Sequence, residues 1–236
     1  RSTMTAGYYF RLIAFKKSGS SYVFQSVADY TANGANAPVL KQGSIICFVG
    51  QTYRFVAYSF NNASALGALP GSYTWNSTAI SIPNLNNDFL TFDSGDKAAT
   101  GASYSLPISF THQLCRLTVK ISVTGFSSNT FTNCTGVYIK QGGNSSSWTV
   151  GASGVAANTN NTGTFNIANN NTTTSTRLVP FAGARAITVH FGTLTVGGKA
   201  ANNTDITSSQ SVKLLAGRSY TMTVQFKKLM GTQVPS

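Results

Sequence analysis

The sequence predicts an all-β fold made of β-sandwich domains. Apolar and polar side chains alternate along short runs, and clusters of Gly, Asn and Ser separate these runs. Successive residues of a strand point to opposite faces of its sheet, so this alternation is typical of strands with one buried face. Helical periodicity is missing, and the runs in the second half are spaced as in a β-sandwich.

The strands expected in the first half are bounded by turn-forming residues. Residues 7–17 are apolar on both faces, which indicates a strand that is covered on both sides. Asn61–Leu85 is expected to be irregular, and Asp93–Ala102 is expected to be a polar linker. The predicted strands are Gly7–Lys17, Ser21–Tyr30, Ile45–Val49, Tyr53–Phe60 and Asp88–Phe92.

Leu106–Val123 is the run around which the chain is organised. Its apolar alternation continues to Leu114 and then moves by one residue, to Cys115 and every second residue after it. Such a slip either turns the buried face over or is absorbed by a bulge. We therefore expect one long strand that changes its packing partner near His112, Leu114 and Cys115. This change separates an N-terminal β-sandwich, residues 1–104, from a C-terminal β-sandwich with a short tail, residues 105–236.

The second half continues in the same style, and residues 158–171, rich in Asn and Thr, are expected to form a loop. Gly50–Ala57 and Gly217–Val224 share the pattern G-x-[TS]-Y-x-hydrophobic-x-small. This echo is expected either from duplication of a sandwich domain or from hairpin chemistry that one sandwich uses twice. The predicted strands are Val137–Lys140, Ser147–Val150, Thr164–Ile167, Thr176–Phe181, Ala186–Val196 and Ser211–Lys228.

The chain is strongly basic, with 17 Lys and Arg against five acidic residues, all Asp, and a formal net charge of +12. So few carboxylates leave little material for paired-carboxylate catalysis. The basic residues are scattered, whereas nucleic-acid binding depends on clustered cations that follow phosphates. We therefore expect solvated strand faces and no nucleic-acid partner. A weak attraction to anionic glycans or lipid headgroups is the alternative.

The cysteines and histidines form no metal or catalytic motif. Three Cys leave at least one thiol unpaired, and both Cys47 and Cys115 fit buried positions in strands. Neither His112 nor His190 has metal-like spacing or an Asp nearby in the sequence, and there is no G-x-S-x-G motif. His112 is expected to bond backbone groups that are loosened at the phase slip, and a ligand or a pH-sensitive contact is the alternative. We expect no cofactor, no metal and no enzymatic activity.

Trp75 and Trp148 are the candidates for a carbohydrate site. Both lie in or near predicted loops, where an aromatic ring can stack on a sugar. Packing within the loop is the alternative for such single aromatic side chains. No apolar run approaches the ~18 residues that a membrane-spanning helix needs.

Five motifs occur in a fixed order along the chain. They are YYFRLIAF near the N-terminus, TYRFVAYSF after a Gly turn, DFLTF, the strand FTHQLCRLTVKI that contains His112, and GRSYTMTVQFKK near the C-terminus. Taken in this order, they resemble the fimbrillin-like proteins of the Bacteroidales, relatives of the type V pilus subunits. The resemblance extends from Gly7 to Lys228. It implies two tandem transthyretin-like β-sandwich domains.

The resemblance also implies a non-enzymatic cell-surface protein that acts in adhesion as a stalk, tip or accessory subunit of a pilus. Such proteins are exported as lipoproteins to the outer membrane, cut after an Arg or Lys, and assembled into a fimbrium by β-strand exchange with other pilus subunits. The lipid anchor belongs to the precursor. A host or bacterial surface ligand or glycan would be the adhesion partner. The alternative is a carbohydrate-binding, lectin-like surface module.

The two ends of the chain carry the residues expected to take part in assembly. Arg1 suits the edge of a proteolytic cut, and an artificial chain start explains it equally well. Leu229, Met230 and Val234 are the candidate tail residues for strand exchange. The tail is short for a donor strand, and Pro235 lacks a backbone donor, so a subunit that only accepts a strand is the alternative to a stalk subunit.

Overall fold

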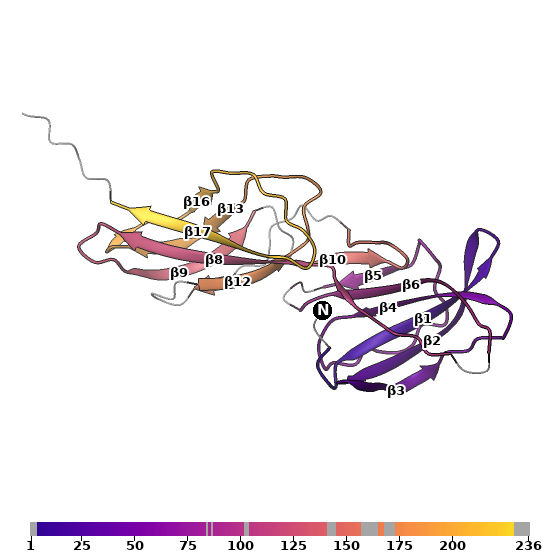
Figure 1. Ribbon diagram of the computed structural model, residues 1–236. Coiled ribbons are helices and arrows are strands. Elements are labelled where there is room, and N and C mark those ends of the chain that lie inside the picture. Colours follow the sequence, from indigo (N-terminus) through magenta and orange to yellow (C-terminus); the bar gives the residue numbers. More distant parts are fainter. Residues whose placement is uncertain are drawn as a thin grey trace, which may run out of the picture. The chain divides into compact units, whose positions relative to one another are not determined.

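The computed structural model describes residues 4–83, 85, 87–101, 104–140, 145–156, 165–167 and 173–228. Their regular elements are all strands, so the all-β prediction is confirmed for this part of the chain (Figure 1). The described residues contain no helix that could span a membrane. The chain forms two compact units: unit 1 comprises Arg1–Leu114 with Ser145–Ala156, and unit 2 comprises Cys115–Asn144 with Ala157–Ser236.

Unit 1 is built on a six-stranded antiparallel sheet in the order β3-β2-β1-β4-β6-β7. β1 and β2 form a hairpin, and β1 lies in the middle of the sheet between β2 and β4. β5 and β10 form a separate antiparallel pair. The strands are β1 (Tyr9–Ser18), β2 (Ser21–Asn33), β3 (Asn36–Ser44), β4 (Thr52–Ser59), β5 (Ala79–Ile82), β6 (Leu90–Ala98), β7 (Thr111–His112) and β10 (Ser146–Thr149).

Both faces of the unit 1 sheet are covered at β1, as the apolar residues on both faces predicted. On the first face, Phe10, Leu12 and Ala14 join a core cluster with side chains of β4. The opposite face packs against buried side chains from the segment between β4 and β6 and from β10. There, the ring of Tyr58 lies 6.0 Å from that of Trp148.

A buried ion pair lies on the opposite face of this sheet. Arg11 of β1 and Asp29 of β2 are register partners, 2% and 0% exposed, and the guanidinium donates two hydrogen bonds of 2.6 and 2.8 Å to the carboxylate. Gln42 of β3 also donates to Asp29, and both Arg11 and Gln42 donate to the carbonyl of Gly67. Because buried charges are costly without such partners, this network fixes the segment after β4 to the sheet.

Unit 2 is a sandwich of two sheets. One sheet has the order β12-β8-β17, and the other has the order β15-β14-β9-β13-β16, with β11 also paired to β9. β17 runs parallel to β8, whereas the other described pairs of unit 2 are antiparallel. The strands are β8 (Cys115–Thr124), β9 (Phe131–Ile139), β11 (Phe165–Ile167), β12 (Thr173–Leu178), β13 (Thr188–Phe191), β14 (Thr193–Val196), β15 (Lys199–Ala200), β16 (Thr204–Thr207) and β17 (Ser219–Lys227).

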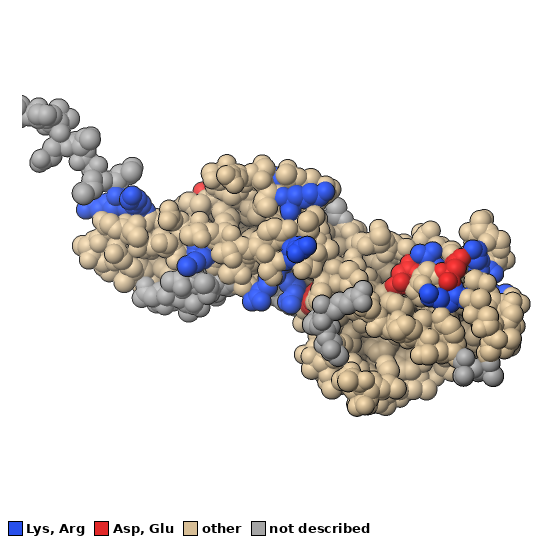
Figure 2. Space-filling view, in the orientation of Figure 1, with Lys and Arg blue, Asp and Glu red and all other residues tan. Residues whose placement is uncertain are grey.

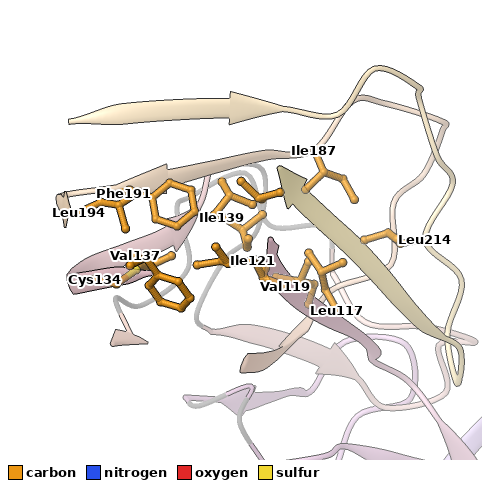
Figure 3. Packing of buried hydrophobic residues seen from close by; sticks show 14 of the residues in the cluster. Leu117, Val119, Ile121, Cys134, Val137, Ile139, Ile187, Phe191, Leu194 and Leu214 are labelled. Carbon is orange, nitrogen blue, oxygen red and sulfur yellow. The ribbon is translucent and has the colours of Figure 1, made fainter. Parts of the chain in front are cut away.

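The core of unit 2 lies between these two sheets (Figure 3). Leu117, Val119 and Ile121 of β8 are at most 1% exposed, and they belong to one cluster with Val137 and Ile139 of β9. Polar residues of β8 alternate with them at partly or fully exposed positions. β8 therefore has the period-two burial that its sequence predicts, and removal of these side chains from water stabilises the unit.

The sequence echo corresponds to the same local structure in both units. Residues 48–51 and 215–218 each form a turn closed by a backbone hydrogen bond of 3.3 Å from the fourth residue to the first. The glycine at the third position has a positive φ in both turns, 84° and 69°, as a type II turn requires. The hydroxyls of Tyr53 and Tyr220 then accept the backbone N–H of the first turn residue, at 2.8 and 2.9 Å. The echo is therefore a shared structural unit.

The Leu106–Val123 run changes its partner where its alternation slips, but it is not one strand. β7 pairs with β6 in unit 1, and β8 pairs with β12 and β17 in unit 2. Gln113 and Leu114 separate β7 from β8. The division into domains 1–104 and 105–236 stays a prediction, whereas the compact units divide after Leu114 and return 145–156 to unit 1.

The predicted strand Ile45–Val49 is wrong, because the strand of this region is β3, which precedes it. β3 lies at the edge of the sheet, where Pro38 is tolerated although it has no N–H to donate. The apolar side chains of Ile46, Phe48 and Val49 are 47%, 59% and 62% exposed. Their pattern therefore does not mark a buried strand.

Other predicted boundaries differ as well. The expected linker 93–102 is largely the second part of β6, and the expected irregular segment 61–85 contains β5. The predicted strand 186–196 is divided at Gly192 into β13 and β14, and only the last part of 211–228 forms β17. Most of the expected loop 158–171 lies outside the described residues.

Candidate functional site

An open groove of about 820 Å³ lies on the first face of the unit 1 sheet. Its walls are the β2–β3 hairpin, residues 32–38, and the segment 105–110. Phe10 of β1 and Leu90 of β6 also line it. Polar and apolar residues therefore line one continuous groove.

Segment 104–110 has the side-chain arrangement of a strand without its pairing. Leu106, Ile108 and Phe110 are half-buried and pack against the sheet, while the residues between them are exposed. Among the described residues, the backbone of this segment makes no hydrogen bond to a strand. Pro107 contributes to this, because it has no N–H. The segment therefore covers the sheet but leaves its own polar backbone groups available.

Aromatic packing fixes the base of the groove. Phe10 is 3% exposed, and its ring stacks on that of Tyr30 with 5.4 Å between the ring centroids. Phe110 meets Phe10 edge to face at 5.5 Å. Burial raises the pKa of the Tyr30 hydroxyl, which is therefore neutral at physiological pH.

His112 lies at the edge of the groove, where the chain leaves unit 1. Its Nδ1 pairs with the carboxylate of Asp88, and the two side chains are 41% and 7% exposed. The structure thus gives His112 a carboxylate partner in place of the backbone groups expected from the sequence. Gln113 follows it, and its backbone N–H donates to the carbonyl of Phe89 at 2.9 Å. This bond holds the last residues of unit 1 against the segment before β6.

The second histidine also has a carboxylate neighbour that sequence separation concealed. His190 of β13 and Asp205 of β16 are register partners, with 2.8 Å between Nδ1 and the carboxylate. Lys140 Nζ lies 2.5 Å from the other oxygen of Asp205, and this contact, with that of His190, lowers the pKa of the carboxyl. No group of three or more His, Cys or Asp side chains that could hold a metal ion occurs in the described ranges.

The cysteines differ between the two units. Cys115 and Cys134 are buried in unit 2, whereas Cys47 is exposed after β3, contrary to the buried strand position expected for it. Burial raises the pKa of Cys115 to about 11, and its thiol donates to the carbonyl of Leu178 at 3.3 Å. Cys115 is therefore protonated and unreactive at neutral pH.

The two tryptophans differ in exposure. Trp148 is 1% exposed and its Nε1 donates to the carbonyl of Ala152 at 2.9 Å, so its ring has no free face for a sugar. Trp75 is half-buried, with the guanidinium of Arg54 4.9 Å from its ring and the ring of Tyr22 4.6 Å away. Glycan stacking therefore stays a prediction for Trp75 alone.

The remaining candidate residues lie at the chain ends and at the phase slip. Arg1, Leu229, Met230 and Val234 lie outside the described residues. Leu114 is the last residue of unit 1 before the chain enters unit 2 at Cys115. The family resemblance implies a strand-accepting groove in the first sandwich, but the residue pattern did not locate it. The one signal in the sequence is the proline that interrupts an otherwise strand-like alternation at 106–110.

A family model described as fimbrillin-like matches residues 1–236. No curated protein matches the sequence significantly. The crystal structure of a proposed cell adhesion protein from Bacteroides uniformis is similar, with a TM-score of 0.58 and 16% identity over 97% of this chain and 89% of that one. A second such protein, from Bacteroides eggerthii, gives a TM-score of 0.58 and 13% identity over 93% and 79%. At these identities the likeness shows a shared fold.

Proposed function

This chain belongs to the fimbrillin-like family, and we propose that it is an exported cell-surface pilus subunit that acts in adhesion and accepts a β-strand from a neighbouring subunit. The family points to a structural protein and not to an enzyme. The observation that carries the proposal is the groove of unit 1 with its unpaired segment 104–110.

The groove has the features that a strand acceptor needs. An added strand gains affinity from backbone hydrogen bonds and gains register from pockets for alternate side chains. Segment 104–110 supplies backbone groups that no described strand uses, and half-buried side chains alternate along it.

Assembly would involve both ends of the chain. The precursor would be a lipoprotein of the outer membrane, cut at Arg1, and other pilus subunits would be the partners. The tail with Leu229, Met230 and Val234 would enter the groove of the next subunit in a stalk position. In a tip or accessory position the chain would accept a strand without giving one.

The lectin-like alternative has less support. Of the two tryptophans that suggested it, Trp148 is buried. The ring of Trp75 is already contacted by Arg54 and Tyr22. A sugar would have to compete with these contacts.

Photo-crosslinking from the groove tests the proposal. p-Benzoylphenylalanine replaces Ser109, an exposed groove residue, in a chain produced by a fimbriate Bacteroides strain, and a control carries it at Ser20 in the β1–β2 turn. Illumination should join the Ser109 position, but not the Ser20 position, to an extended segment of another subunit, identified by mass spectrometry. Equal products from both positions would contradict strand acceptance, as would products formed only within the chain.

A charge in the groove should block the same step. Ile108→Asp places a carboxylate where a partner strand would exclude water, so its desolvation should reduce incorporation into surface fibres at least tenfold, as counted by immunogold labelling. Val23→Asp is the matched control, since Val23 is exposed on unit 1 and does not line the groove. Normal incorporation of the Ile108 variant would refute a role for the groove.

A further inference from the structure

The net charge is divided unequally between the two units. Unit 2 contains ten of the 17 Lys and Arg and one Asp, a net charge of +9, whereas unit 1 contains seven and four Asp, a net charge of +3. Figure 2 shows the acidic side chains gathered mainly on unit 1, with Lys and Arg spread over unit 2. The one Asp of unit 2, Asp205, belongs to β16, so the β12-β8-β17 sheet has no acidic residue.

The outer face of the β12-β8-β17 sheet carries cations separated by hydroxyl and amide groups. Arg116 and Lys120 are exposed on β8, on the face opposite to its buried apolar residues. Arg177 of β12 and Lys227 of β17 occupy the same outer face by register. The other outward positions whose side chains are described hold Ser, Thr or Gln. This face is therefore polar throughout its described part and positive.

The cations follow the strand direction at wide intervals. Arg116 and Arg177 are register partners, directly opposite each other on strands about 4.8 Å apart. Lys120 lies four residues further along β8, which corresponds to about 13 Å. Lys227 pairs with Thr124, another four residues along. The charges thus form a track about 27 Å long.

The Arg116–Arg177 pair is unfavourable in isolation, because like charges directly opposite each other in a sheet are destabilising. Arg116 is nevertheless held in place, since its Nη2 donates to Ser175 Oγ at 3.2 Å. Ser175 Oγ also shares a 3.0 Å hydrogen bond with Thr118 Oγ1. The exposed guanidinium group of Arg116 suits carboxylate or sulfate oxygens, which accept its parallel N–H groups.

We propose that this face of unit 2 docks an acidic polysaccharide, a sugar polymer that carries carboxylate or sulfate groups. The cations bind the acidic groups, and the Ser, Thr and Gln side chains between them bind sugar hydroxyls. A lipid surface suits the face less well, because none of its described residues is an exposed large apolar side chain. Single-stranded nucleic acid also suits it less well, since no described aromatic ring is exposed there for base stacking.

The test measures binding of the intact protein to polygalacturonate and dextran sulfate, with neutral dextran as the uncharged control. Arg116→Gln/Lys120→Gln removes two charges from the face. Lys140→Gln/Lys199→Gln removes two charges from the other sheet, at the residue directly after β9 and in β15. The first variant should bind about tenfold more weakly than the unchanged protein, the second within about twofold of it, and added salt should weaken binding.

Equal weakening in both variants would overturn the proposal, because binding would then follow net charge alone. It would also be overturned if phosphatidylglycerol vesicles or oligothymidylate bound as tightly as the polysaccharides and depended on the same two residues. Binding to neutral dextran would also overturn the proposal. So would a failure to bind either acidic polysaccharide at low salt. None of these measurements involves the groove of unit 1, so the two proposals stand or fall separately.

Discussion

Unit 1 and unit 2 use charge in opposite ways. In unit 1, Asp29 is paired with Arg11 inside the fold, and Asp93 is paired with Arg54 at 2.6 Å near the surface. In unit 2, Asp205 is the one carboxylate among side chains, and a whole sheet presents cations outward. The Asp side chains of unit 1 thus fix contacts within the fold. In unit 2 one Asp pairs with Lys140 and His190, and Lys and Arg outnumber it ten to one.

The two units also differ in how they cover apolar surface. Alternate side chains of β8 are completely buried between the sheets of unit 2. In unit 1, the segment 104–110 covers its sheet only partly and leaves a groove. A fully covered core leaves the outer face of its sheet free to carry charge, whereas a partly covered sheet leaves apolar side chains lining a groove.

The chain supplies a separate reporter for each unit. Trp75 and Trp148, its two tryptophans, both belong to unit 1, and the buried thiols of Cys115 and Cys134 both belong to unit 2. Tryptophan fluorescence therefore follows unfolding of unit 1, and thiol labelling follows unfolding of unit 2. Cys47→Ser removes the exposed thiol from the second measurement.

The largest expected effect is that of Arg11→Leu on unit 1. The change leaves the buried carboxylate of Asp29 without its cation, which should lower the free energy of unfolding by about 3–5 kcal/mol. Urea unfolding followed by tryptophan fluorescence measures it, while thiol labelling of unit 2 should be unchanged. Arg11→Leu/Asp29→Leu should regain most of the loss. A single variant as stable as the unchanged protein would show that the pair does not hold unit 1 together.

The next effect compares two leucines of the same run. Leu117→Ala should destabilise unit 2 by about 3 kcal/mol, because the side chain is 1% exposed and leaves a cavity. Leu106→Ala should cost unit 1 less than about 1 kcal/mol, because this side chain is already half-exposed in the groove. Urea unfolding with the two reporters measures both. Similar losses in the two units would contradict the difference in coverage.

A further effect, specific to unit 2, is the alkaline behaviour of Cys115. Burial raises its pKa from about 9 in the unfolded chain to about 11, so the thiol favours the folded state fully below pH 9 and loses that contribution as the pH rises to 11. The loss should be about 2–3 kcal/mol. Unfolding of unit 2 in urea, followed by circular dichroism at pH 8 and pH 10.5, measures it. The free energy of unfolding of the Cys115→Ala variant should change less between the two pH values. An equal change in this variant would assign the effect to other groups.

The sequence predicts the structural features that depend on residues close together in the chain. The β1–β2 hairpin, the cover on both faces of β1 and the buried alternation of β8 all follow from local pattern. Local pattern failed at 45–49, where apolar side chains are exposed after an edge strand that contains Pro38. An edge strand needs less burial and fewer backbone donors, so its sequence is not strand-like.

The rest depends on register between distant strands. The pairs His112–Asp88 and His190–Asp205 arise only when their strands align, and neither histidine has an Asp close by in the sequence. The alternation of apolar and polar residues likewise does not predict that β17 pairs in parallel with β8. The position of the groove was missed for the same reason, because it is bounded by segments about 70 residues apart.

Residues 145–156 have a consequence for how the protein is made. They complete unit 1 through β10 and the buried ring of Trp148, although translation reaches them only after β8 and β9 of unit 2 have appeared. β8 must in turn wait for β17, near the end of the chain. Neither unit can therefore finish on the ribosome before much of the other has been synthesised. A prematurely terminated chain would expose apolar side chains that are buried in the complete fold, and this exposure would favour its aggregation or degradation.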